Sequence, residues 1–189
     1  PTPDIRSEVA TLIAGKTTGE DKVRALYAYV STQIRYIGVA FGVGRYQPHA
    51  ASEVLANQYG DCKDKHTLLA AMLRAAGFQP DAVLIGAGVG FNPDVPSPAA
   101  LNHCITHLMP DGQSVWLDST AEIAPYRMLV SVIRDKQALV VPGDASAAPY
   151  IARTPAAPPF LSFETMDATG TLDQNGTSHS RITITLRAI

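Results

Sequence analysis

The chain has 189 residues, of which 46% are hydrophobic and 17% are charged, and its formal net charge is -2. This composition is typical of a globular protein and excludes a disordered or collagen-like chain. Lysine and arginine are scattered singly, so we expect no nucleic-acid partner. No apolar run approaches the roughly 20 residues that a membrane-spanning helix needs, so we expect no membrane insertion within this chain. A chain of this length needs no disulfide to hold its core, which leaves Cys62 and Cys104 free for chemistry.

The first part of the chain predicts two helices separated by a loop. Thr18 is a candidate N-cap, and apolar residues at helical spacing predict a helix over residues 19–36. The glycine-rich residues 37–49 are expected to form an irregular loop. Ser52 is then expected to start a short helix that stops before Gly60.

The most apolar helix is predicted to begin at Asp61 or Cys62. Asp61 is a candidate N-cap, Asp64 places an acid in the first turn, and Gly77 is a candidate C-terminal cap. The expected buried stripe consists of Leu68, Leu69, Met72, Leu73 and Ala76. This stripe predicts a helix at the centre of the fold.

Three strands are predicted after the central helix. The first covers residues 82–88, and the other two cover residues 103–109 and 113–118. The tripeptide Pro-Asp-Gly at residues 110–112 joins the last two strands and indicates a β-hairpin.

The composition changes near residue 141 and suggests three segments. We expect a core over residues 1–140 and a connector rich in proline and alanine over residues 141–159. Residues 160–189 alternate apolar and polar side chains around Asn175-Gly176, which predicts a β-hairpin. A lone hairpin is marginally stable, so this segment is expected to pack on the core or to begin a further β domain.

Cys62 is a candidate nucleophile. At the first turn of a helix it lies at the positive end of the helix dipole, which favours the thiolate. Unpaired N–H groups in the same turn can stabilise an oxyanion. Free cysteines are also common in protein cores, so a catalytic role requires a base among the five histidines.

His103 is the histidine with the best expected partner. It opens one strand of the predicted hairpin, and Asp118 ends the other, so the two side chains are expected to be neighbours. The central helix, packed on this sheet, would bring Cys62 to the same end. The result would be a nucleophile, a base and an orienting acid.

The other histidines are weaker candidates. His66 lies four residues after Cys62 and is the alternative base, but its ring would point along the helix rather than across a cleft. His107 shares the strand of His103 but lies near the turn, and no partner is identified for His49 or His179.

Two segments, YGDCKDKHTLLAAMLRAAGF and NHCITHLMPDGQSVWLDST, resemble the bacterial transglutaminase-like domain, a branch of the papain-like cysteine fold. The resemblance covers about residues 20–125. It implies an α+β fold in which the helix that carries Cys62 packs on an antiparallel sheet. It also implies that Cys62 is the nucleophile, His103 the general base and acid, and Asp118 the residue that orients His103.

The resemblance further implies acyl transfer or amide hydrolysis through a thioester, on a protein or peptide substrate and without a cofactor. Bacterial relatives of this type carry the domain between β-rich domains, generally in exported proteins. The resemblance therefore implies a periplasmic or exported protein of the cell envelope with flanking β domains.

Some features differ from the animal cross-linking transglutaminases. Those enzymes have a tryptophan upstream of the cysteine and use calcium, whereas the single tryptophan here is Trp116 and no loop has the spacing of calcium ligands. Hydrolysis is therefore favoured over cross-linking.

Trp116, on the strand face of Asp118, is expected either to line the cleft or to pack in the core. Gln58 and Tyr59 either contact the substrate or the oxyanion, or only form a turn, and Cys104 is expected in the core.

Three other interpretations stay open. A zinc site made of Cys62, Cys104 and a histidine would lack the close ligand pairs of structural zinc, so no metal is expected. An inactive protein-binding or scaffolding module would keep the fold without the activity. An acetyl-transferring relative with the same triad order would carry an Arg- and Gly-rich segment around its cysteine, and this segment is absent from the sequence.

The loop of residues 86–100 is expected to shape the cleft, but its sequence does not indicate which substrate the cleft binds.

Overall fold

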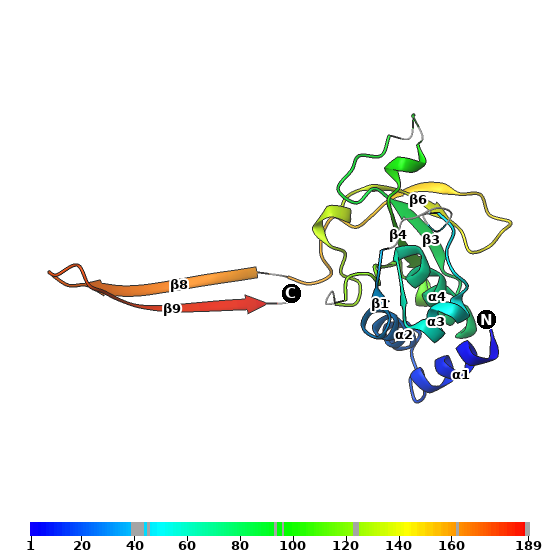
Figure 1. The fold of residues 1–189 in the computed structure, drawn as a ribbon, viewed down its shortest axis with the longest axis horizontal. Coiled ribbons are helices and arrows are strands. Elements are labelled where there is room, and N and C mark those ends of the chain that lie inside the picture. Colours follow the sequence, from blue (N-terminus) through cyan, green and yellow to red (C-terminus); the bar gives the residue numbers. More distant parts are fainter. Residues whose placement is uncertain are drawn as a thin grey trace. The chain divides into compact units, whose positions relative to one another are not determined.

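The computed structural model of the chain describes residues 1–38, 44, 46–92, 94–95, 97–122, 125–161 and 163–187. The chain divides into two compact units, Pro1–Ala157 and Pro158–Ile189 (Figure 1). The helices are α1 (Pro3–Leu12), α2 (Gly19–Gln33), α3 (Ala51–Asn57) and α4 (Cys62–Ala75), with short 3-10 turns η2 (Pro98–Ala100), η3 (Pro110–Gly112) and η4 (Ser131–Ile133). The strands are β1 (Arg35–Tyr36), β2 (Tyr59–Gly60), β3 (Asp81–Ile85), β4 (His103–Leu108), β5 (Val115–Leu117), β6 (Gln137–Val141), β7 (Tyr150–Arg153), β8 (Phe163–Leu172) and β9 (Ser178–Arg187). None of the helices described is long and apolar enough to cross a membrane.

Helices α2 and α3 follow the predictions except at their ends. The Thr18 side chain accepts a hydrogen bond from the Asp21 N–H at 3.0 Å, as expected of an N-cap. α2 ends at Gln33 rather than at residue 36, because the next residues form β1 and pair in parallel with β2. α3 begins at Ala51, one position before the predicted Ser52, without a side-chain cap.

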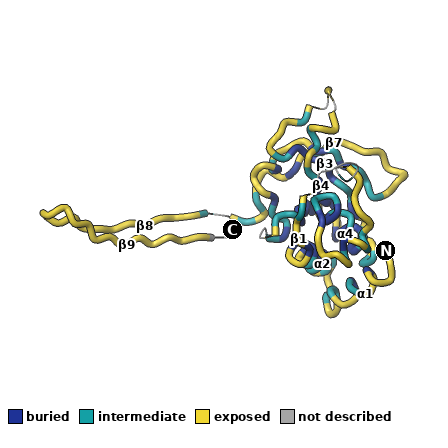
Figure 2. The backbone as a smooth tube through the Cα atoms, viewed as in Figure 1, coloured by how far each residue is buried: buried dark blue, intermediate teal, exposed yellow. Residues whose placement is uncertain are grey.

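The central position of α4 is confirmed. Its predicted stripe residues Leu68, Leu69, Met72 and Leu73 are fully buried in the main core. The other members of this core come from α1, α2, α3, β4, β5 and the segment after β5. Figure 2 shows α4 as one of the most buried segments of the chain. Gly77, predicted as the C-terminal cap, has a φ of 91°, a left-handed conformation that glycine adopts without strain.

The first unit contains a five-stranded antiparallel sheet with the order β5-β4-β3-β6-β7. The helices lie on one side of this sheet (Figure 1). A second core cluster contains Val83, Ile85, Ile105, Trp116, Leu129, Ile133, Ala138 and Val140. The predicted hairpin is formed by β4 and β5, with Thr106 opposite Leu117 and η3 at the turn. These observations confirm the α+β class.

The predicted boundary at residue 140 and the connector over residues 141–159 are wrong where they meet the sheet. β7 lies inside the predicted connector and pairs with β6, with Val140 opposite Tyr150. The Gly143 N–H also donates to Asp81 Oδ1 at 3.0 Å, which fixes the chain between these two strands. A four-residue edge strand in a segment rich in proline and alanine leaves too little alternation in the sequence to be recognised.

The second unit contains the predicted terminal hairpin. β8 and β9 are antiparallel, and the Gly176 N–H donates to the Asp173 carbonyl at 3.1 Å in the turn. Met166 lies opposite Ile184, and both side chains are exposed. That this hairpin packs on the core or begins a further β domain stays a prediction.

Candidate active site

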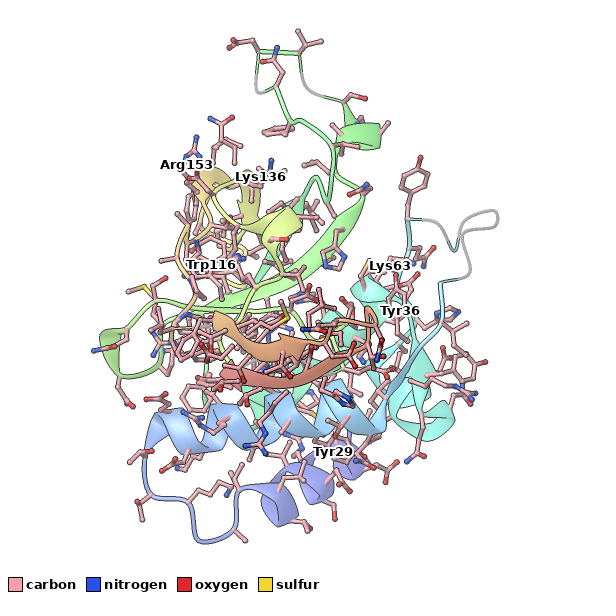
Figure 3. All side chains as sticks on the ribbon, turned by 90° about the vertical axis from the view of Figure 1, so that its left-hand side faces the viewer. Tyr29, Tyr36, Lys63, Trp116, Lys136 and Arg153 are labelled. Atoms are coloured by element: carbon pink, nitrogen blue, oxygen red, sulfur yellow. The ribbon has the colours of Figure 1, made fainter. Side chains whose placement is uncertain are left out.

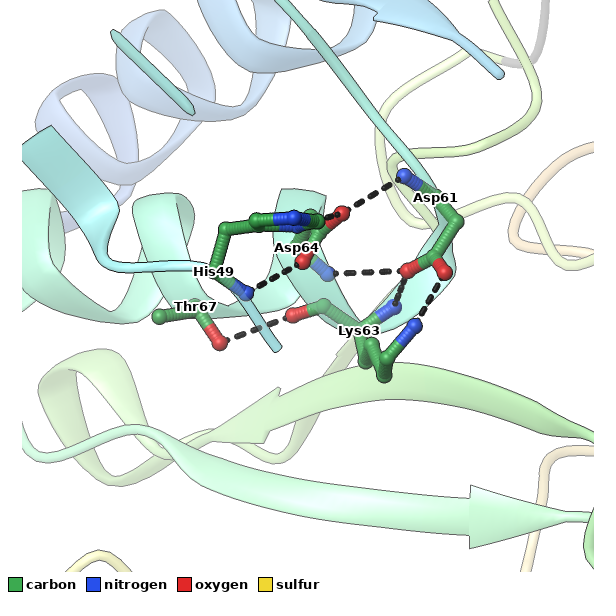
Figure 4. A network of polar contacts seen from close by, with 5 residues as sticks. All are labelled: His49, Asp61, Lys63, Asp64 and Thr67. Atoms are coloured by element: carbon green, nitrogen blue, oxygen red, sulfur yellow. Dashed lines mark hydrogen bonds and ion pairs between the residues drawn. The ribbon is translucent and has the colours of Figure 1, made fainter. Parts of the chain in front are cut away.

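The N-terminus of α4 is fixed by a capping box around Cys62. Asp61 Oδ1 accepts hydrogen bonds from the N–H groups of Lys63 at 3.1 Å and Asp64 at 3.2 Å, and Asp64 Oδ2 accepts from the Asp61 N–H at 3.2 Å. The Lys63 ammonium pairs with the other oxygen of Asp61 (Figure 4). Cys62 is the first residue of the helix and is partly exposed. The cap therefore orients the turn that carries the thiol.

His49 also has a partner, which the sequence did not indicate. Asp64 accepts a hydrogen bond from the His49 N–H at 2.8 Å, and its Oδ2 lies 3.1 Å from His49 Nδ1 (Figure 4). Burial would raise the pKa of Asp64, but the hydrogen bonds from His49 and Asp61 lower it below its ordinary value. The charged Asp64 thus joins the loop before α3 to the first turn of α4.

His103 and Asp118 are neighbours, as the hairpin predicted. His103 Nε2 lies 3.0 Å from Asp118 Oδ2. Asp118 directly follows β5, whose last pair joins Leu117 to Thr106, and reaches His103 at the start of β4. Thr120 donates to Asp118 Oδ1 through its N–H at 3.0 Å and its hydroxyl at 2.6 Å. Asp118 is therefore held on both carboxylate oxygens.

Charges around His103 keep its ring protonated at neutral pH. Burial alone would lower the pKa of His103, but hydrogen bonds with Asp118 and Cys62 and the charges of both groups raise it to about 9. Burial would likewise raise the pKa of Asp118, but His103 and the two bonds from Thr120 lower it. Because Asp118 occupies Nε2, Nδ1 is the ring nitrogen that is left for Cys62.

The alternative base His66 faces the sheet instead. Its Nδ1 lies 2.8 Å from the hydroxyl of Thr106 on β4. Burial, reinforced by the charge of Arg74, lowers the pKa of His66 to about 4, so the ring is neutral at physiological pH. His66 therefore packs α4 on the sheet.

His107 forms a second Asp–His pair on the same strand. Its Nδ1 lies 3.0 Å from Asp81 Oδ2 and its Nε2 lies 3.0 Å from the hydroxyl of Ser114. Its ring centroid is 4.6 Å from that of Trp116. Both nitrogens of His107 therefore have partners within the sheet and the adjacent turn.

Cys62 and His103 open onto a cavity of about 870 Å³. The cavity is mostly apolar, with walls contributed by α4, the loop before β4 and four strands of the sheet. Its described lining residues are Tyr36, Gly38, Tyr46, Asp61, Cys62, Lys63, Leu84, Phe91, Ser97, Pro98, Ala99, Leu101, Asn102, His103, Cys104, Leu139 and Ile151. A mostly apolar hollow with a few convergent polar groups is typical of a ligand or substrate site.

Three predicted substrate residues do not line this cavity. Gln58 is exposed and ends α3 with a left-handed φ of 56°, and the exposed Tyr59 pairs with Arg35 through its backbone. Trp116 belongs to the second core cluster, and Figure 3 places it well away from Tyr36 and Lys63. A contact of Gln58 or Tyr59 with the substrate or the oxyanion stays a prediction. Cys104 is buried, as expected, and also contributes to the cavity lining.

Tyr36 is a site residue that sequence reasoning missed. It lines the cavity, and burial together with the negative charges of Cys62, Asp61 and Asp118 raises its pKa. Its hydroxyl is therefore protonated and can donate a hydrogen bond. The sequence pattern places Tyr36 at the end of the predicted helix of residues 19–36 and does not reveal that β1 pairs with the strand before Cys62.

Lys65 was also missed, although it is fully buried. Its ammonium donates to the carbonyl oxygens of Ser31 at 3.2 Å and Ile34 at 2.6 Å, at the C-terminus of α2. Burial lowers its pKa to about 8, although the charges of Glu122 and Asp118 act in the opposite direction. A lysine in this position joins the end of α2 to the second turn of α4.

The described residues contain no group of three or more His, Cys, Asp and Glu side chains that could hold a metal ion. This finding gives no support to the zinc interpretation within this part of the chain.

Two solved structures share the fold. A candidate protease from Parabacteroides distasonis ATCC 8503 aligns with a TM-score of 0.62 and 16% identity, over 82% of this chain and 28% of that one. A candidate cysteine protease from Cytophaga hutchinsonii aligns with a TM-score of 0.51 and 14% identity, over 95% of this chain and 58% of that one. The chain thus spans well under two thirds of either structure. None of the curated proteins matches this chain.

Comparison with a family model adds evidence from the sequence. The model of the transglutaminase-like superfamily matches residues 7–116, a region that contains α4 with Cys62 and the strand that begins at His103. This match covers more than half of the chain and agrees with the resemblance that the sequence motifs indicated. The chain therefore belongs to the transglutaminase-like superfamily.

Proposed function

We propose that the protein is a cysteine-dependent enzyme that hydrolyses an amide, or transfers its acyl group, through a Cys62–His103–Asp118 triad. The observation that carries this proposal is that His103, whose Nε2 lies 3.0 Å from Asp118 Oδ2, lines the same cavity as Cys62. Each residue has a distinct role. Cys62 is the nucleophile, His103 transfers protons, and Asp118 fixes the ring.

In the first half of the reaction, the Cys62 thiolate attacks the amide carbonyl carbon and forms a tetrahedral oxyanion. When this intermediate collapses, the C–N bond breaks and the imidazolium of His103 gives its proton to the departing amine. The product that stays on the enzyme is a thioester. Water or a second amine then attacks the thioester, His103 takes its proton, and the thiolate leaves.

Two groups are candidates to stabilise the oxyanion. The Asp61 cap binds the N–H groups of Lys63 and Asp64, so the Cys62 N–H is the first-turn donor that this cap leaves available. The protonated hydroxyl of Tyr36 is the second candidate, because it lines the same cavity. Donors fixed before the reaction stabilise the developing charge strongly.

An acyl-transfer assay tests this proposal. The protein would be incubated with hydroxylamine and with panels of glutaminyl peptides, other peptide amides and cell-wall peptide fragments, while amine release and hydroxamate formation are measured. We expect the wild type to release amine and form hydroxamate from at least one donor, and the Cys62→Ala variant to give only the background rate. Equal rates for both proteins on every donor would favour an inactive scaffolding module.

A further inference from the structure

The floor of the cavity is a row of apolar side chains that crosses four strands. Cys104 lies opposite Leu84, Leu84 lies opposite Leu139, and Leu139 lies opposite Ile151. Directly paired residues project from the same face of an antiparallel sheet. All four side chains line the cavity that holds Cys62 and His103. We call these four residues the apolar row.

Most of the apolar row is open to the cavity rather than packed in a core. Leu84 and Leu139 are half-buried, and Ile151 is 42% exposed. Their neighbours Val83 and Val140, which project from the other face, are fully buried. Exposed apolar area that is grouped in a cavity favours an apolar ligand, because binding removes this area from water.

The wall beside the apolar row comes from a loop whose two ends are joined by hydrogen bonds. It contains Phe91 and Leu101 from the loop between β3 and β4. Asn102 closes this loop, because its side chain accepts from the Ala87 N–H at 2.8 Å and donates to the Ala87 carbonyl at 3.2 Å. The residue that precedes His103 therefore joins the two ends of the loop that supplies Phe91 and Leu101 to the cavity.

The charges in the cavity argue against a charged substrate group. Asp61 and Lys63, both in the lining, pair with each other. His103 pairs with Asp118, with 3.0 Å between Nε2 and Oδ2. Among the described lining residues, each Asp, Lys or His thus has an opposite charge as partner. A charged substrate side chain would lose its hydration without gaining a free counter-charge.

We propose that the apolar row binds a bulky apolar side chain of the acyl donor, next to the carbonyl carbon that Cys62 attacks. This inference rests on the proposed function and specifies its substrate class, a peptide or peptide-like amide with an aliphatic or aromatic residue on the acyl side. The acyl group stays on Cys62 through both halves of the reaction, so the apolar row would hold it until the thioester is resolved.

Peptidyl electrophiles that carry only the acyl side test this inference. Acetyl-Xaa acyloxymethyl ketones, with Xaa as Leu, Phe, Gly or Asp, would be reacted with the protein, and the labelling rate of Cys62 would be measured by mass spectrometry. We expect the Leu and Phe reagents to react roughly 10-fold or more faster than the Gly and Asp reagents, because small changes in apolar fit give discrimination of this size.

Two variants locate the preference in the apolar row. Leu139→Asn and Ile151→Asn are each expected to reduce the Leu-to-Asp rate ratio by about 5-fold or more, because one apolar contact is lost. Tyr150→Asn is the matched control, since Tyr150 is also an exposed residue of β7 but projects from the opposite face. It should leave the ratio unchanged. Ile151 lies on an edge strand, so its replacement tests the row even if Leu139→Asn fails to fold.

The labelling rate with iodoacetamide separates this inference from the proposed function, because this small reagent does not need the apolar row. Suppose that iodoacetamide alkylates Cys62 normally. Equal labelling rates with the four ketones, or faster labelling by the Asp reagent, would then overturn the substrate class alone. Retention of the wild-type preference in both row variants would overturn the role of the row. A Cys62 that reacts with neither type of reagent would overturn the proposed function and this inference together.

Discussion

Replacement of His103 by asparagine is expected to lower turnover by roughly 10⁴-fold or more, the range found when a member of a catalytic triad is removed. Asparagine can keep a polar contact with Asp118 but cannot accept and return a proton. Without the imidazole, no ring is left to give a proton to the departing amine. The turnover number in the hydroxamate assay measures the effect.

His66→Asn is the matched control for this prediction. His66 lies on the same helix as Cys62, but its neutral ring bonds to Thr106. We expect its replacement to leave turnover within about 3-fold of the wild type, as for a residue that is distant from the chemistry. The opposite result, loss of activity in His66→Asn and retention in His103→Asn, would make His66 the base. Thermal unfolding of both variants would show whether each is folded.

Asp118→Asn is expected to lower turnover by roughly 10³- to 10⁴-fold, as in other triads whose acid is replaced by its amide. Thr120 donates two hydrogen bonds to Oδ1, so the amide oxygen of the new side chain would occupy that position. Its NH₂ group would then face His103 Nε2. This arrangement keeps the proton on Nδ1, the nitrogen that has to accept a proton from the thiol.

The pH dependence gives this prediction a second readout. Asp118 is one of the groups that raise the pKa of His103 to about 9, whereas burial lowers it. In Asp118→Asn the lowering effect of burial stays, so the pKa of His103 falls. As the pH rises, the ring of His103 then loses its proton at a lower pH than in the wild type. The residual activity that depends on the protonated ring should therefore also be lost at a lower pH. An unchanged profile of turnover against pH would contradict the assigned role of Asp118.

Asp81→Asn is a close structural control. Asp81 also binds a histidine of β4 through Oδ2, at 3.0 Å, and a backbone N–H through Oδ1. The pair it forms with His107 lies outside the cavity lining. We expect this variant to lose stability by about 1–3 kcal/mol, because a buried charged hydrogen bond is weakened, while turnover of the folded protein is retained.

The geometry of the candidate triad could be predicted from the sequence because its members have strong local signals. Asp61 and Asp64 indicate a helix start at Cys62, and Pro110-Asp111-Gly112 indicates a hairpin between His103 and Asp118. A hairpin limits which residues can meet, so the pairing follows once the turn is recognised. The capping box and the contact of 3.0 Å between His103 and Asp118 agree with that reasoning.

The other site features depend on contacts between distant segments. Tyr36 reaches the cavity because β1 pairs with β2. Lys65 donates to the carbonyl groups of Ser31 and Ile34, which lie far earlier in the chain. Trp116 illustrates the limit of strand alternation. Alternation places it on the face of Asp118 but leaves open whether it lines the cleft or packs in the core. Trp116 lies opposite His107, toward the end of β4 away from His103, and packs in the second core cluster. β7 was missed because a short edge strand has little sequence signal.

The most direct test of the central claim is the alkylation of Cys62 by iodoacetamide between pH 5 and pH 9 in the wild type and in His103→Asn. Cys104 is an internal control, because burial raises the pKa of its thiol and should keep it unreactive in the folded protein. At pH 6.5 a free cysteine is only about 1% thiolate. We predict that wild-type Cys62 reacts several-fold faster than a free cysteine at this pH, and that His103→Asn loses this advantage. Identical pH profiles for the two proteins, or a wild-type profile that matches free cysteine, would contradict a Cys62 thiolate that is paired with His103.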